Sequence, residues 1–228
     1  MLLLFDIDGT LTWGGPAKDA FQRGLEVVFG TAGPIEDHDF SGKTDPQIAR
    51  ELLERVGVER ARFEGLADAL WDAYLTELEV QIAHSPVTAL PGARQLLEVL
   101  HESEDACLAL VTGNLERGAH LKLGSVGLAD FFPVGAFGSD HEERNLLPGV
   151  AMERAASHFG RAFAGHDTVV IGDTPRDIAC GRAVGAATVA VATGRYRVDE
   201  LEAFGPDLLF EDFSDTAATV QELRTLFP

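Results

Sequence analysis

Two aspartates stand where the first apolar run of the chain ends, in the segment Phe5-Asp6-Ile7-Asp8-Gly9-Thr10. Residues two apart in an extended chain point to the same side, about 6 to 7 Å apart along the strand, so we expect one substrate to meet both Asp6 and Asp8. Gly9 would let backbone amides approach an anion closely. The pattern favours paired carboxylate chemistry over its alternative, a polar strand end followed by a turn.

A second acidic group follows another apolar run, where residues 169–172 lead to Asp173 and, four positions on, to Asp177. A carboxylate placed beside Asp6 and Asp8 would be repelled unless a cation lay between them, and hard oxygen ligands suit Mg²⁺. The pattern therefore predicts a magnesium site. Asp177 has a second interpretation as the cap of a helix expected to begin at Ile178.

A third strand end lies between these two, in the segment Leu110-Val111-Thr112-Gly113-Asn114. Thr112 offers a hydroxyl, and the free amides of Gly113 and Asn114 at the opening of a helix would form an anion site. Ordinary helix capping by Thr112 or Asn114 is the alternative. Because the carboxyl ends of parallel strands meet at one edge of a sheet, all three segments are expected to converge there.

The elements that must position these residues are short, continuously apolar runs separated by helical patterns. Such runs are typical of strands buried on both faces, so the chain is predicted to be an α/β protein with a three-layer, Rossmann-like parallel sheet. Strands are expected at residues 2–7, 106–111, 168–171 and 187–192, with weaker candidates at 134–137 and 208–210. Helices are expected at residues 92–104, 115–126, 148–159, 177–184 and 215–226.

The stretch from residue 13 to residue 87 interrupts this alternation, because it contains three helical patterns and no convincing strand. These patterns cover residues 18–29, 46–56 and 62–83. We interpret residues 15–85 as an inserted, all-helical cap domain, and residues 1–14 and 86–228 as the core domain. Trp71 and Tyr74 recur at helical spacing and are expected to belong to the core of the cap.

The composition narrows the possible partners. The chain has 228 residues, with 37 acidic and 18 basic side chains and a formal net charge of −19, which disfavours nucleic acids and anionic membrane surfaces. Two cysteines exclude a disulfide framework, and the short apolar start is neither a signal peptide nor a membrane span, so a cytoplasmic location is expected. Lysines are scarce, being only Lys18, Lys43 and Lys122, which makes their positions informative.

Taken in order, these motifs resemble those of the haloacid dehalogenase superfamily, and in particular its phosphoglycolate phosphatase-like members with a helical cap. The resemblance implies that Asp6 is a nucleophile that forms an aspartyl-phosphate and that Asp8 is the general acid and base. It also implies Mg²⁺ on the side chains of Asp6 and Asp173 and the main-chain carbonyl of Asp8, with Asp177 nearby. Thr112, with Gly113 and Asn114, would bind the phosphoryl oxygens.

The chain departs from the family pattern at its third motif, where a lysine followed by proline is usual. Here Arg144 is the nearest cation, and we predict that it takes the place of the lysine. A surface arginine paired with Glu142 or Glu143 is the alternative. In the cap, Lys43 is a candidate for contacting an anionic leaving group; its alternative is a solvated lysine beside a helix cap at Asp45.

The resulting expectation is a Mg²⁺-dependent phosphomonoester hydrolase that acts on a small phosphorylated metabolite similar to phosphoglycolate. The cap would close over the sheet edge and exclude water. A sugar-phosphate mutase similar to β-phosphoglucomutase has the same core residues and stays open as an alternative, as does a non-catalytic phosphate-binding module. Carbon–halogen hydrolysis is disfavoured because Asp8 is present. The oligomeric state is left open.

Overall fold

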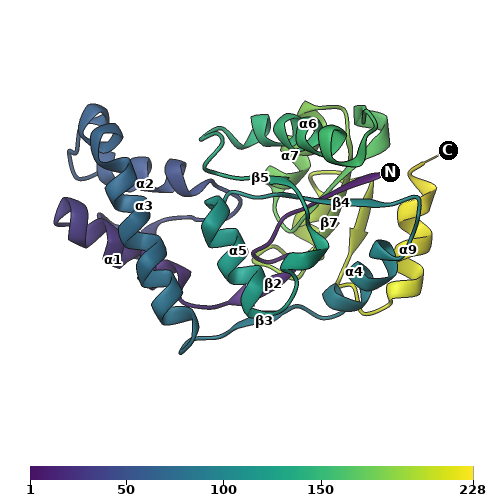
Figure 1. Ribbon diagram of the computed structural model, residues 1–228, viewed down its shortest axis with the longest axis horizontal. Coiled ribbons are helices and arrows are strands. Elements are labelled where there is room, and N and C mark those ends of the chain that lie inside the picture. The colour runs from purple at the N-terminus through teal and green to yellow at the C-terminus, as the bar shows by residue number, and fades with distance from the viewer. Residues whose placement is uncertain (228) are drawn as a thin grey trace.

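The computed structural model describes residues 1–227, and a parallel sheet of six strands forms the centre of its larger part (Figure 1). The strands are β1 (Leu2–Phe5), β4 (Cys107–Val111), β5 (Gly135–Ala136), β6 (Thr168–Gly172), β7 (Ala187–Val191) and β8 (Leu208–Phe210). Their order is β5-β4-β1-β6-β7-β8, with every neighbouring pair parallel. The central strand β1 thus lies between the two strands that carry the other predicted motifs.

Helices cover both faces of this sheet, which gives three layers. Alternate residues of β1 divide between the faces: Leu3 and Phe5 pack with α4 (Ala93–His101), α5 (Glu116–Ser125) and α9 (Thr216–Thr225). On the other face, Leu2 and Leu4 pack with α6 (Leu147–Phe159) and α7 (Pro175–Ala183). Burial on both faces explains why the strands read as continuous apolar runs. The predicted fold class is confirmed.

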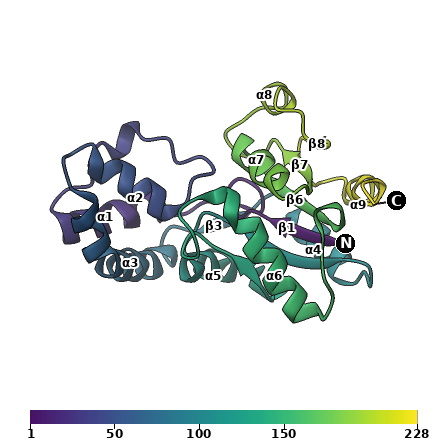
Figure 2. The same ribbon diagram turned by 90° about the horizontal axis from the view of Figure 1, so that it is seen from above.

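Three further helices, α1 (Ala17–Phe29), α2 (Asp45–Glu54) and α3 (Arg60–Ile82), lie together at one end of the molecule, away from the sheet (Figures 1 and 2). This group of helices with its loops is called the cap below, and the part around the sheet is called the core. They share an apolar cluster of their own, to which α5 adds Leu115 from its amino-terminal end. Within it the rings of Phe21 and Tyr74 meet edge to face at 5.0 Å between centroids. Tyr74 and the partly buried Trp71 thus pack in this cluster, as the helical spacing predicts.

The prediction that residues 13–87 hold no strand is wrong at both ends. β2 (Thr12–Gly14) and β3 (Val87–Ala89) pair antiparallel, with Trp13 opposite Thr88. Each strand is too short to show periodicity in the sequence, and it forms because the chain leaves and re-enters the core at the same place. The helix α8 (Val198–Glu202) was not expected either. Among the described residues, no helix combines the length and the apolar character that crossing a membrane requires.

Candidate active site

Three buried carboxylates meet at the carboxyl ends of the neighbouring strands β1 and β6. Asp6, Asp173 and Asp177, called the acid cluster below, each place an oxygen within 4.8 Å of the other two. Their exposed fractions are only 4%, 3% and 1%, respectively. The parallel pairing of Phe5 with Ile171 brings these segments side by side, so that the convergence predicted from the strand ends is present.

Burial and mutual repulsion make negative charge costly in the acid cluster. Burial raises the pKa of Asp6 to about 6, although the nearby Arg144 guanidinium opposes the increase. Burial, followed by the charges of Asp177 and Asp6, raises the pKa of Asp173 well above its usual value. Three carboxylates face one guanidinium, so an excess of negative charge remains that a divalent cation would neutralise. The donor set, made of hard oxygens, fits Mg²⁺.

Arg144 is the cation of this cluster, and the surface alternative for it is wrong. Its exposed fraction is 4%, and it forms an ion pair with Asp177 while its Nη2 lies 3.3 Å from Asp6 Oδ1. Burial disfavours the charged guanidinium, but the carboxylates of Asp177 and Asp6 raise its pKa well above the usual value. Arg144 begins a short 3-10 helix, Arg144–Leu146, that packs against α7 and directs the side chain inward.

Asp177 belongs to the capping interaction of α7, but it is not the residue that begins the helix, so the predicted cap is wrong in its position. Helix α7 begins at Pro175 instead of Ile178, and Thr174 is its N-cap. One carboxylate oxygen of Asp177 accepts hydrogen bonds from the backbone N and the hydroxyl of Thr174, at 3.0 and 2.6 Å. The other oxygen faces Arg144. The capping interaction therefore orients the carboxylate that takes part in the acid cluster.

Gly9 permits the close approach of this loop to the acid cluster. It has a φ of +87°, and a Cβ at this position would lie 2.3 Å from Asp173 Oδ2. The strand itself ends at Phe5, so strand alternation does not explain where Asp8 points, contrary to the expectation above. Asp6 is buried, whereas 46% of the Asp8 side chain is exposed.

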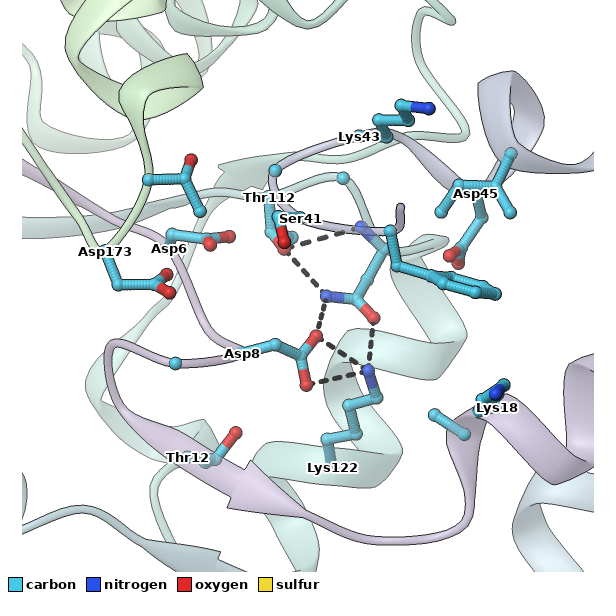
Figure 3. Close-up of a pocket in the computed structure, with 18 of the residues that line it drawn as sticks. Asp6, Asp8, Thr12, Lys18, Ser41, Lys43, Asp45, Thr112, Lys122 and Asp173 are labelled. Atoms are coloured by element: carbon cyan, nitrogen blue, oxygen red, sulfur yellow. Dashed lines mark hydrogen bonds and ion pairs between the residues drawn. The ribbon is translucent and has the colours of Figure 1, made fainter. Parts of the chain in front are cut away.

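A network of polar side chains holds the Asp8 carboxylate (Figure 3). The Lys122 ammonium donates to both oxygens of Asp8, at 2.9 and 2.7 Å, and to Asn114 Oδ1 at 2.7 Å. The Asn114 amide nitrogen donates to Asp8 Oδ2 and to the Thr112 hydroxyl, both at 2.8 Å. The capping alternative for Thr112 and Asn114 is wrong, because Leu115 is the N-cap of α5, and the first amides of that helix are bound by the side chains of Asp45 and Ser139.

Lys122 is the residue of this network that sequence reasoning missed. It lies on α5 with an exposed fraction of 4%, between the core and the cap. Lysine is scarce in this chain, which draws attention to Lys122. Asp8 is more than a hundred residues away in the sequence, however, so no local pattern predicts their contact. Only the packing of α5 beside β1 and the cap makes it.

The loop before α2 packs directly on the third predicted strand end. The backbone N of Asp45 donates to Gly113 O at 2.8 Å, and Asp45 Oδ2 accepts from the backbone N of Leu115 at 2.9 Å. A Cβ at Gly113 would lie 2.1 Å from Lys43 O, so only glycine permits this contact. Cap and core therefore meet over the site itself.

Lys43 lies at this junction, but its ammonium is engaged within the cap. It donates to Glu51 Oε2 at 2.6 Å and lies 3.4 Å from His38 Nε2. Only 10% of the side chain is exposed, so the solvated alternative is wrong, and the helix cap is Thr44 in place of Asp45. Figure 3 shows the Lys43 side chain pointing away from Asp6 and Asp8.

A cavity of about 600 Å³ lies between cap and core. Its core side is formed by Asp6, Asp8, Thr112, Asn114, Lys122, Arg144 and Asp173. Its cap side includes Lys18, Ser41 and Lys43. The remaining side chains of that side that the argument below uses, called the cap wall, are those of Phe21, Phe40, Asp45, Ile48 and Tyr74. All of the core residues predicted from the motifs line this cavity except Asp177, which lies behind Arg144.

The chain is similar to known proteins. The family model described as haloacid dehalogenase-like hydrolase matches residues 1–185. The chain is 26% identical to a "Probable phosphatase IndB" of Dickeya dadantii, over 99% of this chain and 95% of that protein. It is also 26% identical to a phosphoglycolate phosphatase of Pseudomonas syringae pv. tomato, over 92% of this chain and 76% of that protein.

Among solved structures, a hydrolase from Pseudomonas syringae superposes with a TM-score of 0.73. It is 24% identical in sequence, and the superposition covers 97% of this chain and 98% of the other. At this level of identity the likeness shows a common fold.

Proposed function

The chain belongs to the haloacid dehalogenase-like hydrolases, and from this premise we propose that it is a Mg²⁺-dependent phosphatase of small phosphomonoesters that uses Asp6 as its nucleophile. The observation that carries the proposal is the acid cluster beside Arg144, at one end of a cavity that also contains Asp8 and Thr112. The names of the two relatives, a phosphatase and a phosphoglycolate phosphatase, support the reaction type.

Asp6 and Asp173 would hold the metal ion, together with the main-chain carbonyl of Asp8, and Asp177 would stand nearby. The excess of buried carboxylates over cations in this place supports the assignment. A bound Mg²⁺ would neutralise charge on the phosphoryl oxygens and on the carboxylates around it.

In the first step we propose that an Asp6 oxygen attacks phosphorus, so that an O–P bond to Asp6 forms while the P–O bond to the leaving alcohol breaks. Arg144, which stays charged among the carboxylates, reduces the repulsion between Asp6 and an incoming phosphate. The Thr112 hydroxyl and the backbone amides of Gly113 and Asn114 would receive the phosphoryl oxygens. Asp8 would give a proton to the departing oxygen.

In the second step, water attacks the phosphorus of the aspartyl-phosphate, which releases orthophosphate and restores Asp6. Asp8 would take the proton of that water. Lys122 and Asn114 donate hydrogen bonds to the Asp8 carboxylate and hold it in one orientation. Residues 15–85 would act as the cap domain that covers these steps.

The test is release of orthophosphate by the purified protein from 4-nitrophenyl phosphate, with Mg²⁺ and with excess chelator. We expect steady turnover only with Mg²⁺, its loss in Asp6→Asn, and its retention in Asp19→Asn, an exposed aspartate of α1. Full activity of Asp6→Asn would contradict the proposal. A mutase would instead transfer phosphate between positions of a sugar phosphate, releasing little orthophosphate.

A further inference from the structure

The size of the cavity exceeds what a phosphate with a two-carbon acid needs. A cavity of about 600 Å³ falls in the range that encloses drug-sized ligands. The cap wall supplies apolar surface to the part beyond the phosphate site, since Phe21 and Ile48 line it with exposed fractions of 3% and 4%. A leaving group with an apolar face would fill this space and displace water from the wall.

The cations around the cavity are already paired with carboxylates. The four pairs are Lys18 with Glu36, Lys43 with Glu51, Lys122 with Asp8, and Arg195 with Asp39, at distances of 2.6, 2.6, 2.7 and 2.8 Å. The fifth cation, Arg144, belongs to the acid cluster. A second anionic group on the substrate would therefore compete with a carboxylate that is already in place. At Lys43, the anionic group of the substrate would lie near the partly buried carboxylate of Glu51.

The cap wall offers instead a carboxylate that is available to a ligand. Asp45 is 9% exposed, and its Oδ2 accepts from the backbone of Leu115, but its Oδ1 accepts no hydrogen bond from residues 1–227. Burial raises the pKa of Asp45 to about 6, although the charge of Lys122 and the hydrogen bond from Leu115 oppose the increase. The hydroxyl of Tyr74, a residue with an exposed fraction of 1%, also makes no hydrogen bond within the described part of the chain. Both residues line the cavity.

We propose that the substrate is the phosphomonoester of a neutral or cationic alcohol, whose apolar face lies on Phe21 and Ile48 and whose hydroxyl or amino group donates to Asp45. This inference rests on the proposed phosphatase function and selects the substrate class for it. Phosphoglycolate, with its carboxylate, is excluded as a preferred substrate. A carboxylate on the leaving group would approach Asp45, and no unpaired cation among the described lining residues would offset the repulsion.

The experiment compares two aryl phosphates of the same size. Tyramine O-phosphate carries an ammonium on its side chain, and 4-(carboxymethyl)phenyl phosphate carries a carboxylate, while both release a phenol. With Mg²⁺ present, we expect kcat/KM to be at least tenfold higher for tyramine O-phosphate. Phosphoglycolate is expected to be slower than O-phosphoethanolamine, which has the same two-carbon length.

Two variants assign the preference to the cap wall. Asp45→Asn keeps an acceptor for Leu115 but removes the charge, and it should bring the ratio between the two aryl phosphates to within about threefold. Asp37→Asn, an exposed aspartate outside the cavity, should leave the ratio unchanged. Tyr74→Phe tests the hydroxyl separately, with a severalfold lower kcat/KM for tyramine O-phosphate.

The outcomes separate this inference from the function on which it rests. If the protein releases no phosphate from any of these compounds with Mg²⁺, the proposed phosphatase function is wrong. If it hydrolyses them but prefers the carboxylate in either pair, the reaction type stands and the substrate class proposed here is wrong. An unchanged ratio in a folded Asp45→Asn variant would also overturn it, and the wild-type ratio remains decisive if that variant fails to fold.

Discussion

The two sides of the cavity differ in how charge is distributed. On the core side, Asp6, Asp173, Asp177 and Arg144 are all buried and crowd together. On the cap wall, apolar side chains surround a single carboxylate, Asp45. The first arrangement costs stability unless a cation and hydrogen bonds compensate it, whereas the second is part of an apolar cluster that stabilises the cap. In the function proposed above, the reaction chemistry and the selection of the leaving group would therefore belong to separate parts of the chain.

The largest difference between the sides concerns turnover. Asp6→Asn should lower kcat by on the order of 10⁴-fold for every substrate alike, because it removes the attacking oxygen. Asp45→Asn should change the ranking of substrates and leave kcat for 4-nitrophenyl phosphate within about tenfold of the wild type. Steady-state kinetics on a panel of phosphomonoesters checks both. If the loss of kcat in Asp6→Asn differed strongly between substrates, the proposed division of roles between the core side and the cap wall would be wrong.

Removing the buried cation should destabilise the core side strongly. Arg144→Met leaves three carboxylates without their partner, and we expect the free energy of unfolding to fall by about 3 to 5 kcal/mol, as measured by denaturant titration with chelator present. The matched variant is Arg154→Met. Arg154 also pairs with an aspartate, at 2.6 Å, but its side chain is 41% exposed, so a loss below about 1 kcal/mol is expected there. If the two variants lost the same free energy of unfolding, burial of the ion pair would not explain the effect of Arg144→Met.

Added Mg²⁺ should stabilise the protein through the core side alone. At a concentration of 100 times its Kd, a ligand that binds only the folded state adds about 2.7 kcal/mol to the free energy of unfolding. Thermal melting with and without Mg²⁺ should show this gain in the wild type and in Asp45→Asn, but not in Asp173→Asn. A gain that persists in Asp173→Asn would place the ion elsewhere.

The smallest expected effect is the pH dependence contributed by Asp45. Because its pKa in the folded state is raised to about 6 by burial, the folded protein binds a proton that the unfolded chain has released. The corresponding stability is present below about pH 4 and is lost as the pH rises through 6. Relative to Asp45→Asn, the wild type should therefore lose about 2 kcal/mol between pH 4 and pH 7. The difference in free energy of unfolding between the wild type and the control variant Asp37→Asn should not change between pH 4 and pH 7.

The core side could be predicted from the sequence because its residues belong to short motifs at strand ends. Asp6, Thr112 and Asp173 each follow a continuously apolar run, and parallel strands bring such ends to one edge. Even the departure at Arg144 was open to prediction, since it is the nearest cation in the third motif. The burial of Arg144 between Asp6 and Asp177 could not be predicted, because Glu142 and Glu143 are closer in the sequence and were equally plausible partners.

Contacts that depend on how distant elements pack, or on how a loop turns, were beyond sequence reasoning. The pair of Lys122 with Asp8 joins residues far apart in the chain, and the engagement of Lys43 by Glu51 depends on how the loop before α2 turns. The short strands β2 and β3 form only because Trp13 and Thr88 meet where the chain leaves and re-enters the core. None of these pairs has a local spacing that would mark it.

The sequence by itself determined the fold class, the order of the motifs and the meeting of Asp6 with Asp173 at one edge of the sheet, because strand burial and strand ends are encoded within a few consecutive residues. Only the tertiary structure decided which carboxylates pair with the cations and where Asp45 lies, since side-chain pairing depends on which distant elements pack together. The selectivity proposed for this hydrolase follows from that second kind of information.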